Sequence, residues 1–172
     1  VTMRCSHPGV PTDERNLCVQ AANRFADAAG LAPSWSIDLE KRIPVAAGLG
    51  GGSSDAAAVL RLLQERTGSP LSNDELRRIA TELGADVPFF LDPQPTLAEG
   101  IGEVLTPVSL GVACGAVLLN PGFPIPARWA YAHWDGIDRP APPNLESALE
   151  WLNSPDLSEI CQGLHNDLEH CV

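Results

Sequence analysis

Residues 44–58 read PVAAGLGGGSSDAAA, a glycine- and serine-rich stretch that separates two regular patterns. Before it, SWSIDLE alternates with Trp35, Ile37 and Leu39 on one side, which is the period of a half-buried strand. After it, residues 53–68 place their apolar side chains on one helical face and end in glycine. The sequence therefore predicts a strand, a glycine-rich loop and a helix, in this order.

A glycine–serine run by itself is typical of a flexible linker or a turn. A linker, however, has no reason to lie between a strand and a well-formed helix. In that position the unpaired N–H groups of the helix N-terminus converge, and the helix dipole adds about half a positive charge. Glycines allow positive φ angles and the close approach of phosphate oxygens. We interpret the stretch as an anion-binding loop.

Two common nucleotide motifs do not fit this loop. The P-loop needs a lysine directly after its last glycine, and the dinucleotide motif, begun at Gly48 and Gly50, meets Ser53 where its third glycine belongs. The remaining pattern, P-x-x-x-G-L-G-G-G-S-S-x-A-A, resembles the phosphate-binding motif of the GHMP kinases. Its triple glycine is similar to the motif found in one branch of that family. This resemblance implies ATP-dependent phosphorylation of the small molecule cytidine diphosphate methylerythritol, with ATP and Mg²⁺ as cofactors.

The resemblance extends over essentially the whole chain. ERNL, KRIP, LGADVPFF, AEGIGEVLTP, NPGFPIPA and NDLE occur in the order in which the family has them. It implies that Asp86 is the catalytic base and contacts the substrate, and that Tyr131 stacks on the cytosine ring. The residues that it implies for ATP binding are Asn16, Leu17, Lys41, Pro44, Gly48, Leu49, Gly50, Gly51, Gly52, Ser53 and Ser54.

For three of these residues a simpler interpretation stays open. Asp86 could cap the turn after a helix that ends at Gly84, rather than accept a proton from a substrate hydroxyl. Tyr131 could pack in a core, and its neighbour Ala132 stands where the family often has lysine. Ser54 could contact a metal or cap the helix, so the metal ligands are left open.

The resemblance implies an α+β fold with two domains. Residues 1–110 would form part of the N-terminal, ATP-binding domain and residues 111–172 part of the C-terminal domain. Family members begin with a strand that carries a catalytic lysine and a Gly-Tyr-His motif, and they end with a further glycine-rich motif. Because the sequence shows none of these, we expect an N-terminal domain without its first strands and a truncated C-terminal domain.

Local patterns predict further elements. Helices are expected over residues 13–29 and 73–83, the second with a capping box that begins at Ser72. TLAEGIGEVLTPV predicts a strand interrupted by glycines, and the apolar run of residues 111–120 predicts a buried strand. LESALEWL and LSEICQGL predict helices near the end of the chain.

Composition restricts the function classes. A net charge of −11 disfavours nucleic acids and anionic membranes as partners, because both repel an acidic protein. The five cysteines contain no C-x-x-C pair, so neither a zinc site nor a disulfide framework is predicted. We expect an enzyme of the bacterial cytoplasm or the plastid. The alternatives are another GHMP kinase, of the homoserine or mevalonate-pathway type, or an inactive nucleotide-binding fragment.

Overall fold

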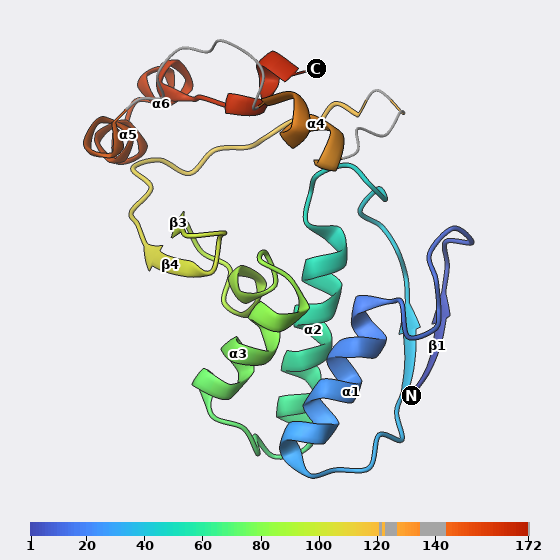
Figure 1. Ribbon diagram of the computed structural model, residues 1–172. Helices are drawn as coiled ribbons and strands as arrows, with labels where there is room; N and C mark the ends of the chain where they lie inside the picture. The colour runs from blue at the N-terminus through green and yellow to red at the C-terminus, as the bar shows by residue number, and fades with distance from the viewer. Residues whose placement is uncertain (121, 123–126, 135–143, 172) are drawn as a thin grey trace. The chain divides into compact units, whose positions relative to one another are not determined.

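Two parallel strands and a connecting helix begin the fold in the computed structural model, which describes residues 1–120, 122, 127–134 and 144–171 (Figure 1). β1 (Thr2–Cys5) pairs with β2 (Ser36–Leu39), and Met3 lies opposite Ile37. Parallel strands need a crossover connection, which α1 (Leu17–Ala29) provides. The alternation predicted for β2 is confirmed, since its apolar side chains are half-buried and its polar ones exposed. The sequence patterns did not reveal β1, whose four residues are too few to establish a period.

The chain divides into two units, and each is described by itself. The first contains Val1–Val45, Leu49–Gln94 and Ala98–Thr106. The second contains Ala46–Gly48, Pro95–Leu97 and Pro107–Val172. The two-domain assignment with a boundary after residue 110 stays a prediction.

The ends of α1 follow from local chemistry. The helix predicted over residues 13–29 begins only at Leu17, because the side chain of Asn16 caps it by accepting a hydrogen bond from the Cys18 N–H at 2.9 Å. The helix ends at Gly30, whose φ of 66° lies in the left-handed region that favours glycine. Both boundaries are therefore set by single residues next to the helix.

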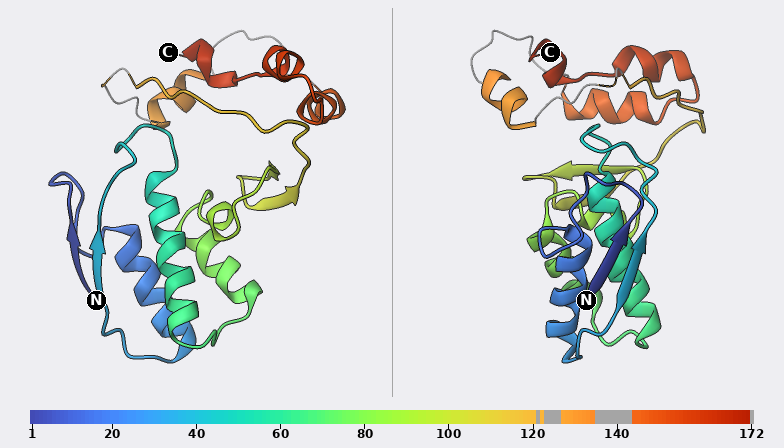
Figure 2. Two further views of the ribbon diagram at one scale, coloured as in Figure 1. Left: turned by 180° about the vertical axis from the view of Figure 1, so that it is seen from behind. Right: turned by 90° about the vertical axis from the view of Figure 1, so that its right-hand side faces the viewer.

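The core of the first unit lies between three helices that cover one side of the strand pair (Figure 2). α2 (Gly51–Arg66) and α3 (Asn73–Leu83) confirm the predicted helices. Fully buried alanines face each other between α1 and α2, which lets the two backbones approach closely. The largest fully buried side chains are those of Phe25, Leu60, Ile79 and Val87.

The capping box predicted at α3 is present, and its removal should destabilise the first unit. The Ser72 hydroxyl accepts a hydrogen bond from the Glu75 N–H at 3.3 Å, and the Glu75 carboxylate accepts one from the Ser72 N–H at 2.8 Å. We expect Ser72→Ala to lower the free energy of unfolding by about 1 kcal/mol in urea titrations. Asn73→Ala is the control, because its side chain makes no hydrogen bond within the described residues. An equal loss in both variants would contradict a capping role.

This stabilisation should depend on pH. Hydrogen bonds from the backbone N–H and the hydroxyl of Ser72 lower the pKa of the Glu75 carboxyl. A carboxyl with a lowered folded-state pKa stabilises the fold above its unfolded-state pKa, and this contribution is lost as the pH falls through the folded-state value. The difference in unfolding free energy between the parent chain and Glu75→Gln should therefore shrink below about pH 4. A difference in unfolding free energy that stays constant down to about pH 2 would contradict this pH dependence.

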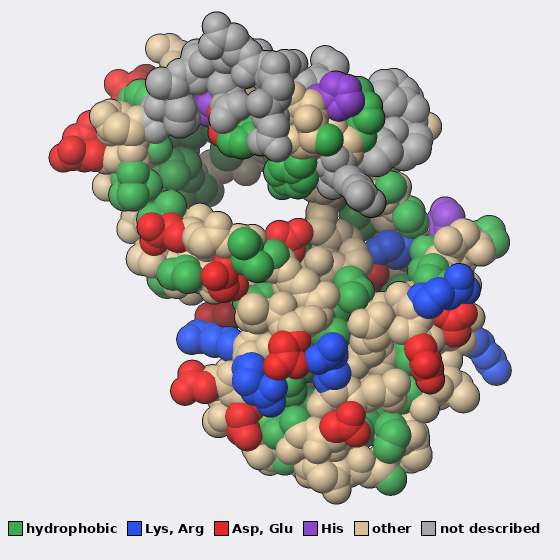
Figure 3. Space-filling model, viewed as in Figure 1, with side chains coloured by type: hydrophobic (Ala, Val, Ile, Leu, Met, Phe, Trp, Pro, Cys, Tyr) green, Lys and Arg blue, Asp and Glu red, His purple; other side chains and the backbone are tan. Residues whose placement is uncertain are grey.

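Charged side chains of both signs are interspersed over the face of the first unit seen in Figure 3. On its helices, Arg24 of α1 and Arg78 of α3 each place a guanidinium nitrogen 2.6 Å from a carboxylate oxygen of Glu82. These groups are all substantially exposed, so each pair contributes little to stability.

The apolar run of residues 111–120 does not form the predicted buried strand. The structure assigns it no strand, and Val117, Leu118 and Leu119 are 88%, 71% and 92% exposed. A strand needs a neighbour for its backbone hydrogen bonds, and none pairs with this run within the described residues. The strand predicted for TLAEGIGEVLTPV is divided by its glycines into two strands. These are β3 (Thr96–Glu99) and β4 (Val104–Pro107), which pair as a two-stranded sheet.

The described helices of the second unit are α4 (Ala127–Trp134), α5 (Leu145–Leu152) and α6 (Leu157–Gly163). The last two confirm the helices predicted for LESALEWL and LSEICQGL. Two short 3₁₀ helices, Pro88–Leu91 and Asp167–Cys171, complete the elements described. Most of the NPGFPIPA motif lies outside the described residues. Among the residues that the structure describes, every helix is too short or too polar to pass through a lipid bilayer.

Candidate functional site

The N-terminus of α2 differs from those of the other α-helices whose N-caps the structure describes. Its N-cap is Gly50, with a φ of 64° and no side chain that could cap the helix. The first intrahelical bond runs from the Ser54 N–H to the Gly50 carbonyl at 2.8 Å, so the N–H groups of the three preceding residues have no acceptor within the helix. The other α-helices whose N-caps are described all carry a capping side chain, from Asn16, Ser72, Asn144 and Asp156.

The loop that leads into this helix has an unusual backbone. Positive φ angles recur at every second residue, with 58° at Ala46, 69° at Gly48 and 64° at Gly50. Chains that alternate in this way turn successive N–H groups toward one side and create an anion-binding concavity. An alanine in the left-handed region costs about 1 kcal/mol, and such strain gathers at functional sites. The local geometry agrees with the anion-binding loop that the sequence predicts.

The three consecutive glycines serve different purposes. A Cβ on Gly50 would lie 2.7 Å from the Phe90 ring, and one on Gly51 would lie 2.9 Å from Ile43. Packing therefore requires both of these glycines. A Cβ on Gly52 would meet only Leu17, at the ordinary contact distance of 3.8 Å. Gly52 is exposed, and no contact with the described residues accounts for its missing side chain.

The close packing at Gly51 gives a prediction about stability. We expect Gly51→Ala to lower the free energy of unfolding by about 1–3 kcal/mol, because the new methyl group must displace Ile43 and the ammonium group of Lys41. Thermal and urea denaturation measure the loss. Gly115→Ala is the matched control, since a Cβ there meets nothing within 4 Å. Unchanged stability of Gly51→Ala would refute the requirement for glycine at this position.

An ion pair lies beside the first turns of α2. The ammonium of Lys41, just after β2, is 2.5 Å from the Asp55 carboxylate, and the two side chains are 7% and 20% exposed. The Lys41 N–H donates to the Ser6 hydroxyl at 2.8 Å, which anchors the lysine backbone. Burial raises the pKa of the Cys18 thiol to about 12, and the negative charge of Asp55 is the second cause of this shift. The Cys18 thiol is therefore uncharged at neutral pH.

Asp55 is the residue of this site that sequence reasoning missed. Its signal was available, because an acidic residue four positions after Gly51 shares a helix face with it. The sequence did not reveal that this face of α2 contacts Lys41, just after β2, because that contact depends on the fold.

The structure brings several of the predicted ATP-binding residues near one another. Leu17, at the start of α1, approaches Gly52, and Lys41 approaches Gly51. Asn16 is buried, and its amide also donates to the Pro11 carbonyl at 2.6 Å, so its side chain is engaged in capping. The predicted contacts of these residues with a nucleotide stay predictions.

The two serines of the loop occupy the first turn of α2. The Ser54 hydroxyl donates to the Gly51 carbonyl at 2.9 Å, which is a bond within the helix rather than a cap of a free N–H group. Its oxygen retains lone pairs that could accept a further contact. Ser53 is half-buried, whereas Pro44 and Leu49 of the preceding loop are exposed.

Asp86 lies in the turn between α3 and the 3₁₀ helix Pro88–Leu91. It is exposed, although the adjoining Val87 and Pro88 are buried. Its carboxylate accepts no hydrogen bond from the described residues, which disfavours the alternative that it caps the turn. A solvent-facing carboxylate without a partner is free to accept a proton from a ligand.

Tyr131 lies in α4 of the second unit. Its side chain is 60% exposed, which contradicts the alternative that it packs in a core. Ala132 beside it is exposed as well. The proposed stacking of Tyr131 on a cytosine ring stays a prediction.

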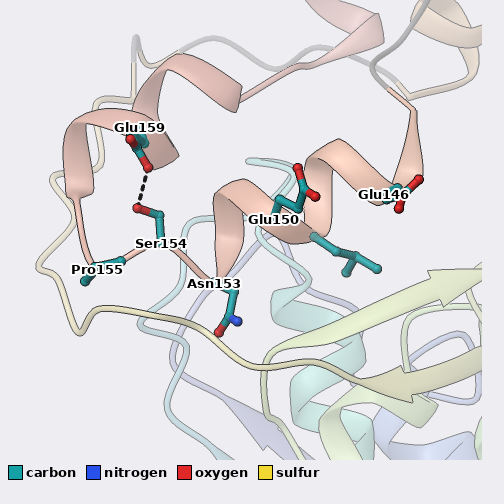
Figure 4. A pocket seen from close by; sticks show the side chains of 7 residues that line it. Glu146, Glu150, Asn153, Ser154, Pro155 and Glu159 are labelled. Atoms are coloured by element: carbon teal, nitrogen blue, oxygen red, sulfur yellow. Dashed lines mark hydrogen bonds between the residues drawn. The ribbon is translucent and has the colours of Figure 1, made fainter.

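A concavity in the second unit lies between α5 and α6 (Figure 4). The Ser154 hydroxyl donates to the Glu159 carboxylate there at 2.6 Å. Across the described residues, no three histidine, cysteine, aspartate or glutamate side chains converge in a way that could hold a metal ion. The residues that line the concavity are Glu146, Leu149, Glu150, Asn153, Ser154, Pro155 and Glu159.

Comparisons with known proteins agree on one family. Residues 16–92 match the N-terminal domain of the GHMP kinases. The 4-diphosphocytidyl-2-C-methyl-D-erythritol kinase of Chlorobium phaeovibrioides is 39% identical over 100% of this chain and 60% of its own length. The enzyme of the same name from Chloroherpeton thalassium is 40% identical over 100% of this chain and 61% of its own length.

A solved structure gives the same result. The crystal structure of a 4-(cytidine 5'-diphospho)-2C-methyl-D-erythritol kinase matches with a TM-score of 0.66 and 33% identity, over 98% of this chain and 59% of that one. The chain thus spans about 60% of the length of the curated relatives it matches.

Proposed function

We propose that the chain belongs to the GHMP kinase family and forms the ATP-binding part of a kinase for 4-diphosphocytidyl-2-C-methyl-D-erythritol. The proposed reaction transfers the γ-phosphoryl group of ATP to the 2-hydroxyl of that substrate, a step of non-mevalonate isoprenoid biosynthesis. The proposed location is the cytoplasm of a bacterium.

The observation that carries this proposal is the uncapped N-terminus of α2. Its free N–H groups and the positive end of the helix dipole suit the phosphates of a nucleotide. Gly52 supports the same conclusion, because its missing side chain leaves open the surface that a phosphate would approach. The residues present therefore fit an ATP phosphate chain.

In the proposed reaction, each group has a defined task. The N–H groups of residues 51–53 hold the phosphates, and Lys41 adds positive charge beside them. Mg²⁺, when bound, would neutralise negative charge on the phosphates. Asp86 accepts the proton of the substrate hydroxyl as the hydroxyl oxygen attacks the γ-phosphorus of ATP. Asn16 and Leu17 line the side of the adenine, and Tyr131 stacks on the cytosine ring.

The decisive experiment measures ADP release from the purified chain with ATP, Mg²⁺ and 4-diphosphocytidyl-2-C-methyl-D-erythritol. Release above the rate without substrate is the expected result. Replacing the substrate by homoserine or mevalonate should give no such increase, and cytidine diphosphate should compete with the true substrate. An increase with homoserine or mevalonate alone would assign the chain to another branch of the family.

A second candidate is a nucleotide-binding chain without catalysis of its own. The observation that favours it is that the chain spans about 60% of the length of the relatives it matches. ATP binding in calorimetry, with no ADP release in the assay above, is the result that this candidate predicts. Absence of both binding and release would contradict both candidates.

A further inference from the structure

The ion pair between Lys41 and Asp55 is an unusual feature for the position it occupies. The Lys41 side chain is 7% exposed, so it has lost most of its contact with water. Burying two charges costs free energy that their attraction offsets only with good geometry, and apolar residues of similar size are often equally stable. Stability alone therefore does not account for this pair.

Its position relative to α2 suggests a different purpose. The Lys41 ammonium lies 3.0 Å from the place of a Cβ on Gly51, the first residue of the helix. The positive charge thus stands beside the first turn, where N–H groups have no acceptor within the helix. A lysine there is repelled by the positive end of the helix dipole and would turn away without an opposing charge.

Asp55 supplies that opposing charge from the same helix. It is four residues after Gly51, so its carboxylate lies on the helix face against which the lysine chain runs. The bond to Asp55 uses one of the three N–H donors of the ammonium, which leaves others for a ligand. The uncharged Cys18 thiol adds no competing anion.

We propose that Asp55 is a positioning residue that holds the Lys41 ammonium beside the phosphate-binding turn of α2. The proposal rests on the proposed ATP site. In the bound state, Lys41 keeps its bond to Asp55 and donates a second hydrogen bond to a phosphate oxygen. The aspartate, although negative, thereby favours the binding of an anion.

The test compares the affinities of ATP and adenosine for four forms of the chain, by isothermal titration calorimetry. Asp55→Asn should weaken ATP binding about tenfold or more, the loss of one hydrogen bond to a charged group, and leave adenosine binding unchanged. Lys41→Met should weaken ATP binding to a similar extent. The double variant Lys41→Met/Asp55→Asn should be no weaker than Lys41→Met, because the two residues act as one unit.

Glu40→Gln is the matched control for the lost negative charge. Glu40 adjoins Lys41 in the sequence and pairs with Arg42 in the open, where both side chains are largely exposed. The Glu40→Gln variant should bind ATP as the parent chain does. If Asp55→Asn does not fold, Asp55→Glu replaces it: the charge partner is kept, the ammonium is displaced, and ATP binding should weaken about threefold or more.

Three results would overturn the proposal while leaving the proposed function standing. The first is that the tested Asp55 variant binds ATP as tightly as the parent chain or more tightly. The second is that Glu40→Gln weakens ATP binding as much as the Asp55 variant does. The third is that the loss of ATP affinity in the double variant equals the product of the losses in the two single variants. A parent chain that binds no ATP would instead refute the proposed ATP site, and the role of Asp55 with it.

Discussion

Replacing Gly52 with alanine is expected to weaken ATP binding strongly while leaving the fold at least as stable as before. Gly52 is the second residue of α2, where alanine is favoured over glycine by up to about 1 kcal/mol. Its new methyl group would meet only Leu17, at 3.8 Å, so no packing is disturbed. The same methyl group would stand where we propose that phosphate oxygens approach the helix.

The expected loss follows from the cost of steric overlap in a close-fitting site. An overlap that costs about 1.4–3 kcal/mol weakens binding roughly 10- to 150-fold. Calorimetric titration with ATP gives the affinity, and urea denaturation gives the stability. Gly115→Ala serves as the control for a neutral glycine replacement.

The comparison with the neighbouring glycine sharpens this test. Gly51→Ala is expected to reduce stability, whereas Gly52→Ala is expected to reduce binding alone. Full ATP affinity in a stable Gly52→Ala chain would exclude this turn of α2 as the phosphate site. Lost stability in that variant would instead show that packing accounts for the glycine.

Replacing Asp86 with asparagine is expected to reduce turnover severely and to leave ATP binding nearly unchanged. Asparagine keeps the size of the side chain and cannot accept a proton at neutral pH, so a general base is lost without a change of shape. General-base catalysis contributes about 10²- to 10⁴-fold, and turnover should fall by that factor. ADP release at saturating ATP is the measurement, in a polypeptide that carries these residues within a chain of the relatives' length.

Asp92→Asn is the matched control, because Asp92 is also an exposed aspartate, directly after the 3₁₀ helix Pro88–Leu91. It should retain turnover. Near-normal turnover of Asp86→Asn would refute the assignment of this residue as the base. A parallel loss of ATP affinity would assign Asp86 to nucleotide binding instead.

Features that depend on a few neighbouring residues could be predicted from the sequence. The capping box at Ser72 is confirmed, as are the alternation of β2 and the course of α2. Each depends on hydrogen bonds or side-chain periods within one or two turns. The anion-binding interpretation of the glycine loop also came from local order, namely strand, loop and helix.

Features that depend on distant partners could not be predicted in this way. The run of residues 111–120 is apolar enough for a buried strand, yet no neighbouring strand accompanies it in the described residues. Asp86 adjoins apolar residues in the sequence, yet its carboxylate faces solvent. In the apolar run, composition indicated burial, and the absence of a neighbouring strand in the described residues determined the outcome.

By itself, the sequence determined that a glycine-rich loop precedes a helix, because glycine spacing and helical periodicity are local properties. Only the tertiary structure decided what each glycine is for, since the neighbours of Gly50, Gly51 and Gly52 come from other parts of the chain. It alone revealed that Lys41 meets Asp55 across the first turns of α2. Ion pairs and steric contacts act over a few ångströms in space, whatever the separation of their residues along the chain.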